Sequence, residues 1–312
     1  MSKKSQYRIR NWSEYNRSLV QRGSITFWFD EESLKNWFET QSSGKRGRPP
    51  KYSDLAIQCL LLIKSVFHLD FRKLQGFAQS LVELLELTIE IPSYTQICRR
   101  QKALGVGLSH AATNQALHVV VDSTGLKIYG EGEWKVRQHG YSKRRTWRKL
   151  HLGVDEATGE ILAMELTTND VTDDEVFPDL FDQIDEKVIC VSADGAYDKQ
   201  RCYDTLDGLN AQANIPPRKD AVLHQHGNCK EPPLTRDENL RAIRKKGRKR
   251  WKKESGYHRR SLSETAMFRF KSLFGGTLSN RVFDHQVTEA IIKCQAMNKM
   301  TQLGMPDSLL VS

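Results

Sequence analysis

The sequence predicts an α/β fold, a mixed sheet flanked by helices, preceded by an N-terminal all-α domain. Residues 117–121 and 187–193 are nearly continuous apolar runs rich in β-branched residues, and each runs into an aspartate followed by small residues. Such runs are typical of strands that are covered on both faces. Apolar residues at helical spacing between 53 and 104 predict the helices that precede the sheet.

Residues 1–52 are expected to form a basic N-terminal arm. A short amphipathic helix is expected within 28–38, because its acidic start suits the positive end of the helix dipole. The segment 44–51, Gly-Lys-Arg-Gly-Arg-Pro-Pro-Lys, cannot be helical. It resembles an AT-hook, in which Arg46 and Arg48 would lie in a narrow A·T minor groove. A solvated interdomain linker is an equally good interpretation.

Residues 53–110 predict a helical domain. Its first helix, 55–67, would be capped by Ser53 or Asp54, and its second, 71–87, by Asp70. The first is a core helix, since its apolar stretch is too short to cross a bilayer. No secretory signal or membrane span is recognisable, so no membrane partner is expected.

A third helix in this domain follows Pro92, with Ser93 as its N-cap. It carries Arg99 and Arg100, and three short helices with a basic last one predict a helix-turn-helix that places the third in the major groove. The alternative is a helical packing domain whose basic side chains are merely solvated.

Residues 115–300 form the predicted sheet domain, and 301–312 a C-terminal tail. Basic and aromatic residues alternate in 127–149, which suits phosphate contact and base stacking; a solvated hairpin loop is the alternative. Strands at 149–154 and 160–167 are expected to form a hairpin around the turn 155–159.

The rest of this domain alternates further elements with a basic loop. Acids at 173–175 are interpreted as helix N-terminal residues. A helix near 199–209 and a strand near 211–215 follow. We expect 216–256 to be a basic insertion or loop, whose run 244–250 is mobile and binds phosphates.

Four side chains near the end of the sheet domain share a pattern. Tyr257, Arg260, Glu264 and Lys271 fall at offsets 0, 3, 7 and 14. On one helix, at about 100° per residue, they would lie within about 60° of one another. A carboxylate flanked by arginine, lysine and a phenol suits a metal ion beside a phosphate. Glu264 alone would be an ordinary surface acid paired with Arg260.

Two further acids, Asp122 and Asp194, follow the two apolar strands. If those strands are parallel neighbours, their carboxylates can reach a shared cation, and Mg²⁺ prefers such oxygen ligands beside phosphates. Each aspartate alone is more often a turn or cap residue. Three acids in the order strand, strand, helix favour a metal site.

These residues resemble those of bacterial insertion-sequence DDE transposases of the fifth insertion-sequence family. The spacing of Tyr257, Arg260, Glu264 and Lys271 matches that family's signature in full, and Val-Val-Asp-Ser-Thr and Ala-Asp-Gly-Ala-Tyr-Asp resemble its first two acidic motifs. The resemblance covers about residues 20 to 300. It implies an RNase H-like core that cuts and rejoins DNA at the ends of a mobile element.

Our mechanistic hypothesis combines the three acids with this resemblance. Asp122, Asp194 and Glu264 are the expected catalytic acids and the ligands of two Mg²⁺ ions, with Mn²⁺ as a substitute. Arg260 and Lys271 would neutralise phosphates, and Tyr257 would position the strand. The expected partners are double-stranded DNA, at the inverted repeats and the target, and a second copy of the chain. The expected location is the bacterial cytoplasm, at the nucleoid.

Composition agrees with a DNA partner. There are 48 Lys and Arg against 38 Asp and Glu, a net charge of +10. The six cysteines are scattered without a Cys-x-x-Cys pair, which indicates buried thiols in a reducing compartment. The close trio His224, His226 and Cys229 lacks a second cluster, so a structural loop is favoured over a zinc site.

Two rival functions remain open from the sequence. A structure-selective nuclease of the same fold would use the same acids but would not join strands. A non-enzymatic DNA-binding regulator would account for the charge and the helical domain, but not for three acids placed in this way. Metal-dependent cleavage and strand-transfer products separate these possibilities.

Overall fold

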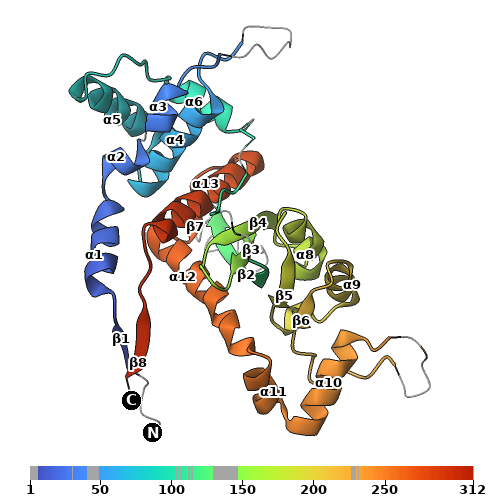
Figure 1. The fold of residues 1–312 in the computed structure, drawn as a ribbon. Helices are drawn as coiled ribbons and strands as arrows, with labels where there is room; N and C mark the ends of the chain where they lie inside the picture. The colour runs from blue at the N-terminus through green and yellow to red at the C-terminus, as the bar shows by residue number, and fades with distance from the viewer. Residues whose placement is uncertain are drawn as a thin grey trace, which may run out of the picture. The chain divides into compact units, whose positions relative to one another are not determined.

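The computed structural model describes residues 6–29, 31–40, 49–102, 104–105, 107–111, 113, 115–128, 147–225, 230 and 232–311. The backbone forms two compact units (Figure 1): Met1–Gly107 together with Ile291–Ser312, and Leu108–Ala290. The first unit thus joins segments that the sequence divides among an arm, a helical domain and the end of the sheet domain. No helix in the described ranges combines the length and hydropathy needed to cross a membrane.

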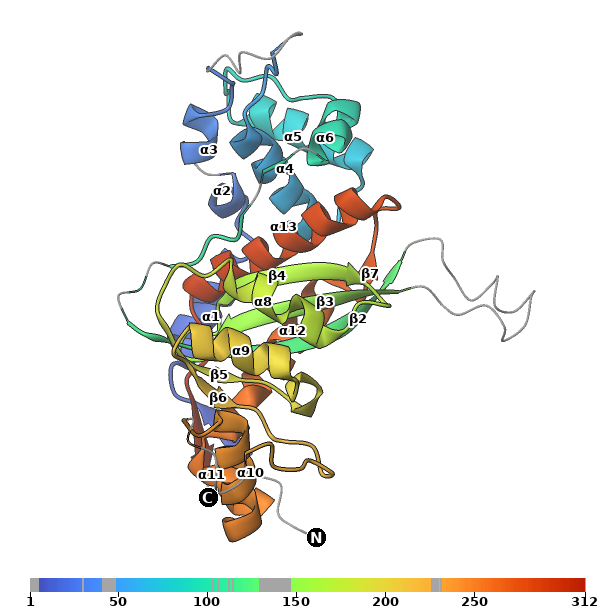
Figure 2. The same cartoon turned by 90° about the vertical axis from the view of Figure 1, so that its right-hand side faces the viewer.

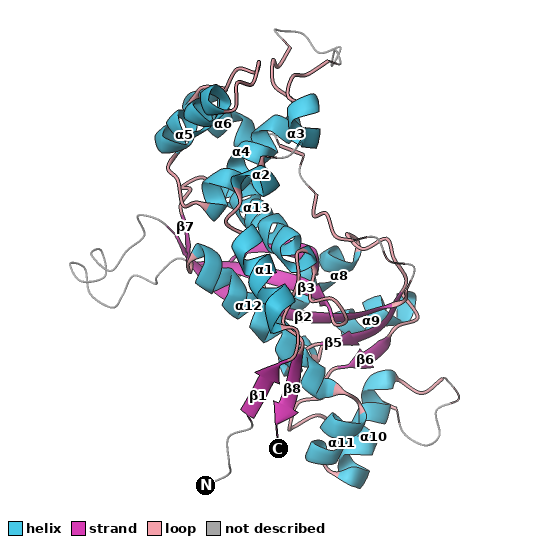
Figure 3. Ribbon diagram, turned by 60° about the vertical axis from the view of Figure 1, so that its left-hand side comes forward, coloured by secondary structure: helices cyan, strands magenta, loops and turns pink. Residues whose placement is uncertain are grey.

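The first unit is mainly helical. Its elements are β1 (Gln6–Ile9), α1 (Trp12–Gln21), α2 (Ile25–Trp28), α3 (Glu31–Lys35), α4 (Asp54–Val66), α5 (Phe71–Leu84), α6 (Tyr94–Gln101), the end of α13 (Phe283–Gln302) and β8 (Ser308–Val311). β1 and β8 pair antiparallel, so the two ends of the chain lie side by side (Figure 3).

Helix caps explain where the three central helices begin. The Ser53 hydroxyl accepts a hydrogen bond from the Ala56 N–H at 3.1 Å, which starts α4. Ser93 and Gln96 form a reciprocal capping box at the start of α6. Asp70 occupies the N-cap position of α5 without a side-chain capping hydrogen bond, and its carboxylate instead pairs with Lys73 at 3.1 Å. The predicted helices are confirmed, although α5 ends at Leu84 rather than near 87.

The second unit is built on a mixed sheet. Its elements are β2 (Leu117–Ile128), β3 (Trp147–Asp155), β4 (Ile161–Thr168), α8 (Asp173–Phe181), β5 (Val188–Ser192), η1 (Gly195–Tyr197), α9 (Gln200–Gly208), β6 (Gln212–Asn214), α10 (Thr235–Lys246), α11 (Arg248–Glu254), η2 (Tyr257–Arg260), α12 (Ser261–Phe274), β7 (Thr277–Leu278) and the start of α13.

The strand order is β4-β3-β2-β5-β6, with β7 paired to β2. β2, β3 and β4 are antiparallel, whereas β5 and β6 run parallel to β2. Helices α8 and α9 cover one face and α12 covers the other (Figure 2). An antiparallel three-stranded meander extended by parallel strands and flanked by helices is the RNase H-like arrangement, so the predicted fold class is confirmed.

Apolar side chains fill both faces of this sheet. Val119 and Val121 of β2 pack with Phe177 of α8 and Leu206 of α9, all essentially inaccessible to water. On the α12 face, Phe270 is completely buried. The hairpin β3–β4 and the acidic first turn of α8 are confirmed. Thr172 and Glu175 form a capping box there, and three acids stabilise the helix N-terminus.

Three expectations were wrong. β2 does not end at Asp122 but continues to Ile128, because β3 pairs with it as far as Lys127 opposite Trp147. The expected loop 216–256 contains α10 and α11, and the basic run 244–250 lies on these helices. Tyr257 and Arg260 do not share one α-helix with Glu264, as described below.

Several predicted features lie outside the described residues. Arg46 and Arg48 of the AT-hook-like segment do, as does most of the basic and aromatic stretch 127–149. His226 and Cys229 of the rejected zinc trio also do.

Candidate active site

Asp122 lies within β2, and Asp194 follows the end of the neighbouring parallel strand β5. β2 pairs with β5 so that Val120 lies opposite Ser192, and the same register continued by two residues places Asp194 opposite Asp122. Adjacent strands lie about 4.8 Å apart. β5 ends at Ser192, and Asp194 then caps the short helix η1 by accepting the Ala196 N–H at 2.8 Å. Asp194 therefore combines a capping role with a position beside Asp122.

Asp122 is a half-buried carboxylate with several polar contacts. Burial raises its pKa above the ordinary aspartate value, and the negative charge of Asp194 acts in the same direction. Three groups oppose this: the Ser123 N–H at 2.9 Å, the Arg260 guanidinium at 3.1 Å and the Ser263 hydroxyl at 3.3 Å.

Glu264 lies in the first turn of α12 and its side chain is 56% exposed. Arg260, one helical turn earlier, donates from Nη1 to Asp122 and from Nη2 to Glu264. Its guanidinium therefore spans the first and third predicted acids. The structure brings Asp122 and Glu264 together through this shared arginine.

Tyr257 lies beside the same arginine. Its ring packs against Trp251 with centroids 6.0 Å apart, and the Arg260 guanidinium lies 5.9 Å from its centre. Burial raises the pKa of the phenol, and the charge of Asp194 adds to this rise while Arg260 opposes it. The phenol is thus a buried, protonated neighbour of the acids at neutral pH.

The four-residue pattern is only partly helical. Tyr257 and Arg260 form the 3₁₀ turn η2, which follows Gly256 with a φ of 69°, and α12 begins only at Ser261. Lys271 lies in the last turn of α12 and is exposed. Within the described residues, no hydrogen bond or ion pair connects Lys271 with the acids. The first three members of the pattern meet, and the fourth lies apart from them.

The donor set suits a hard divalent cation. Asp122, Asp194 and Glu264 offer carboxylate oxygens, the ligands that Mg²⁺ prefers. Among the described residues, however, no three His, Cys, Asp or Glu side chains already surround one point closely enough to hold a metal. The Arg260 guanidinium supplies the positive charge between two of the acids. A metal would have to replace these arginine contacts.

A second group of contacts holds η2 on the sheet. Arg259 forms an ion pair with Glu156 in the β3–β4 turn. The His118 imidazole on β2 lies 2.9 Å from the Ser192 hydroxyl and 4.0 Å from Glu156. Burial lowers the pKa of His118, and the nearby Arg259 charge lowers it further. These contacts join the segment that carries Arg260 to both central strands.

Two residues of this site were missed from the sequence. The Ser263 hydroxyl donates a hydrogen bond to Asp122, but a serine within a helix carries no sequence signal of such a contact. Tyr197 is 1% exposed, and within the described residues its hydroxyl has no hydrogen-bond partner. Burial raises its pKa well above the usual value, with contributions from Asp173, Asp122 and Asp194. Its place three residues after Asp194 was the available clue.

The predicted DNA-contacting residues of the first unit differ in environment. Arg100 is largely committed within the protein, because it donates to Asp54 at 2.5 Å and to the Tyr52 carbonyl at 2.8 Å. Arg99 is exposed and donates only weakly, at 3.3 Å, to the Thr95 carbonyl. Both line a cavity of about 330 Å³ beside Pro50. Arg99 is the better placed of the two for an external ligand.

The chain is similar to several solved structures. One is described as a piggyBac transposase synaptic complex with hairpin DNA, with 9% identity, a TM-score of 0.41, and coverage of 95% of this chain and 76% of that one. A Drosophila P element transposase strand transfer complex matches at 10% identity and a TM-score of 0.29, covering 58% of this chain and 42% of that one. A Mos1 mariner paired end complex with Mn matches at 14% identity and a TM-score of 0.23, covering 94% of this chain and 93% of that one.

Family models match most of the chain. One described as a transposase DDE domain matches residues 113–299, and a second with the same description matches residues 20–131. The first of these matches includes Asp122, Asp194 and Glu264.

Proposed function

This chain belongs to the DDE transposase domain family, enzymes that cleave DNA and transfer its strands, and from that premise we propose that it moves an insertion sequence of the fifth insertion-sequence family. It would bind the terminal inverted repeats, cleave at the element ends and join the freed ends to target DNA. The observation that carries the proposal is the convergence of Asp122 with Asp194, across parallel strands, and with Glu264, through Arg260.

Asp122, Asp194 and Glu264 would hold two Mg²⁺ ions, with Mn²⁺ as a substitute. Such ions supply an activated water nucleophile and stabilise the departing oxygen in phosphodiester chemistry. The half-buried position of Asp122 and its Ser123 N–H hydrogen bond would fix one ligand in direction. Glu264 is the most exposed acid and would complete the site from α12.

The reaction consists of two phosphoryl transfers at this site. In the first, a water molecule loses a proton as its oxygen bonds to phosphorus, the bond from phosphorus to the 3′-oxygen breaks, and that oxygen gains a proton and leaves as a 3′-hydroxyl. In the second, the 3′-hydroxyl loses its proton as its oxygen bonds to a target phosphorus, and the target 3′-oxygen leaves and gains a proton. No net hydrolysis is needed in the second step.

Arg260 would exchange partners during this cycle. In the DNA-free protein it neutralises Asp122 and Glu264, and metal binding would replace it there. The freed guanidinium suits a phosphate, to which it can donate two parallel hydrogen bonds. Tyr257, buried beside it, would limit where the arginine can turn, and Lys271 would contact phosphate further along α12.

DNA recognition would belong to the first unit. Helices α4, α5 and α6 resemble a helix-turn-helix, with Arg99 as the exposed contact and Arg100 as a residue that supports α6. Arg46 and Arg48 would add minor-groove contacts. Two element ends must meet during transposition, so a homodimer on DNA is the proposed assembly.

The test is an end-cleavage and joining assay with labelled duplexes that carry the repeats flanking the gene. Wild-type protein should nick at the element end in Mg²⁺ and yield joined products with a target plasmid. Asp122→Asn, Asp194→Asn and Glu264→Gln should each lose both activities while retaining end binding. Asp207→Asn, an exposed acid on α9, is the matched control. Nicking by any of the three variants would refute the proposed site.

A further inference from the structure

Helix α11 presents two lysines on the side opposite its buried residue. Trp251 is 4% exposed and anchors the helix. At about 100° per residue, Lys249 and Lys253 each lie about 160° from Trp251, on either side of the opposite direction. Both are exposed. One turn separates them, so they are displaced by about 6 Å along the axis.

The neighbouring cations of α11 are committed within the protein, unlike these two. Lys252 lies 4.7 Å from the centre of the Tyr257 ring. Arg250 forms an ion pair with Glu254 at 2.7 Å. In the described part of the chain, Lys249 and Lys253 make no hydrogen bond or ion pair. Two positive charges therefore project from this face.

Helix α11 is directly coupled to the acid site. It ends at Glu254, and the chain turns at Gly256 into η2, so Trp251 packs on Tyr257 (Figure 1 shows α11 continuing from the start of α12). The Asn214 side chain at the end of β6 donates to the Ser255 carbonyl at 2.8 Å. The two lysines are thus held in a defined position relative to Tyr257 and Arg260.

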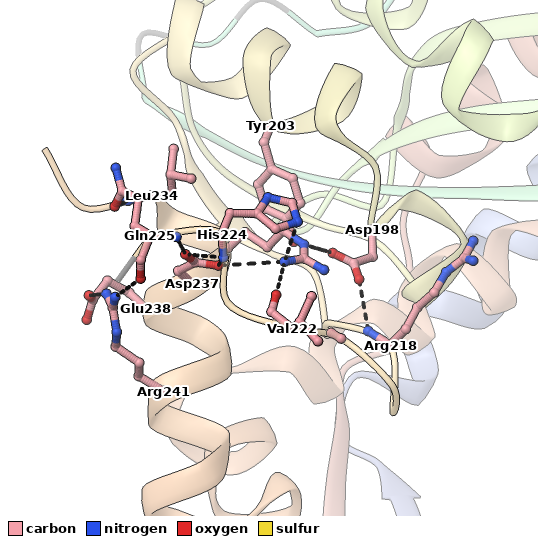
Figure 4. A network of polar contacts seen from close by, with 12 residues as sticks. Asp198, Tyr203, Arg218, Val222, His224, Gln225, Leu234, Asp237, Glu238 and Arg241 are labelled. Carbon is pink, nitrogen blue, oxygen red and sulfur yellow. Dashed lines mark hydrogen bonds and ion pairs between the residues drawn. The ribbon is translucent and has the colours of Figure 1, made fainter. Parts of the chain in front are cut away.

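A buried polar network fixes the other side of the α10–α11 pair (Figure 4). Asp198, four residues after Asp194, accepts hydrogen bonds from the Arg218 N–H and the Arg236 guanidinium, both at 2.9 Å. Asp237 accepts the backbone N–H groups of His224 and Gln225. The pair α10–α11 is therefore attached at both ends to segments that carry predicted catalytic residues.

We propose that Lys249 and Lys253 bind neighbouring phosphates of the DNA strand that runs out of the acid site. The inference rests on the proposed function, and adds a DNA contact surface on α11 to it. Two unpaired ammonium groups on a rigidly held helix suit point-charge contacts with a phosphate backbone. Phosphate contacts do not read the base sequence, so the two lysines would position the strand rather than select a DNA sequence.

The salt dependence of DNA binding tests this surface. Each phosphate contact contributes about 0.9 to the slope of log K against log salt concentration. Lys249→Gln and Lys253→Gln should each lower the magnitude of that slope by about 0.9, and the double variant by about 1.8. Lys187→Gln is the control with the same charge change, because Lys187 is exposed and lies just before β5, at the strand end remote from Asp194.

A second measurement locates the contact on the DNA. Single neutral methylphosphonates are placed at each phosphate within a few nucleotides of the cleavage position. At the contacted phosphate, neutralisation should weaken wild-type binding but not further weaken the matching lysine variant. Additive losses at all positions, or the same slope change in Lys187→Gln, would overturn the inference. Wild-type protein that neither binds nor cleaves element ends would instead refute the proposed function.

Discussion

Replacing Arg260 should strengthen divalent metal binding to the DNA-free protein. Its guanidinium contacts Asp122 at 3.1 Å, and the two side chains are 20% and 18% exposed. A charge-assisted hydrogen bond in such an environment contributes about 1.5–3 kcal/mol. The contact with Glu264, whose side chain is 56% exposed, adds less because water screens it.

A metal that displaces Arg260 loses the free energy of these arginine contacts from its own binding free energy. In Arg260→Gln the contacts are already absent, so metal binding no longer carries this cost. We therefore expect Arg260→Gln to bind Mn²⁺ about 10- to 150-fold more tightly than wild type, at 1.4 kcal/mol per tenfold. Arg260→Lys keeps the charge but loses the two-pronged donor, so its affinity should lie between the two. Mn²⁺ titration followed by electron paramagnetic resonance measures the affinity without any turnover.

Lys271→Gln controls for the loss of one positive charge from the same pattern. Because Lys271 is exposed, its removal should change Mn²⁺ affinity at most about fivefold. Unchanged Mn²⁺ affinity in Arg260→Gln, or equal tightening in Lys271→Gln, would refute the exchange of arginine for metal. Cleavage should fall in Arg260→Gln despite tighter metal binding, since the phosphate contact is also lost.

Three further predictions concern stability. Burial lowers the pKa of His151 to about 4, so the unfolded chain binds a proton more readily than the folded protein does. The free energy of unfolding should therefore fall by about 2 kcal/mol between pH 7 and pH 5. In urea titrations over this pH range, His151→Asn should show a smaller loss. Arg236→Gln removes the ion-pair partner of the buried Asp198 carboxylate and should lower the free energy of unfolding by about 3–5 kcal/mol. Faster amide hydrogen exchange in α10 would show this loss. Ser93→Ala should cost about 1 kcal/mol in thermal or urea unfolding, whereas Asp70→Ala, which removes no cap hydrogen bond, should cost much less.

The strands and helices with a strong apolar pattern could be predicted from the sequence. β2 and β5 were found because each is a nearly continuous run of apolar residues, although Ile189 of β5 is 46% exposed, and α4 was found because its apolar face and its cap coincide. The predicted end of β2 was wrong because Ser123, Thr124 and Gly125 are residue types that are typical of a turn. Pairing with β3 keeps these residues extended, and that backbone ladder does not depend on their side chains.

Elements with few apolar residues were not predictable. α10 and α11 bury little beyond Leu240 and Trp251, so their sequence reads as a charged loop. The β1–β8 pair joins four-residue segments from opposite ends of the chain, and no local pattern could reveal it. The three acids were selected by motif and spacing, but the contacts that Ser263 and Arg260 make with Asp122 depend on the tertiary structure.

Iron-directed cleavage of the polypeptide tests the convergence of the acids most directly. Fe²⁺ with ascorbate replaces Mg²⁺ in the complex with an element end, and generates radicals that cut the backbone close to the metal. The account predicts cuts near Asp122, Asp194 and Glu264 together, suppressed by excess Mg²⁺ and lost in Asp122→Asn. Cuts near only one of these residues, or none that Mg²⁺ suppresses, would contradict a shared metal site.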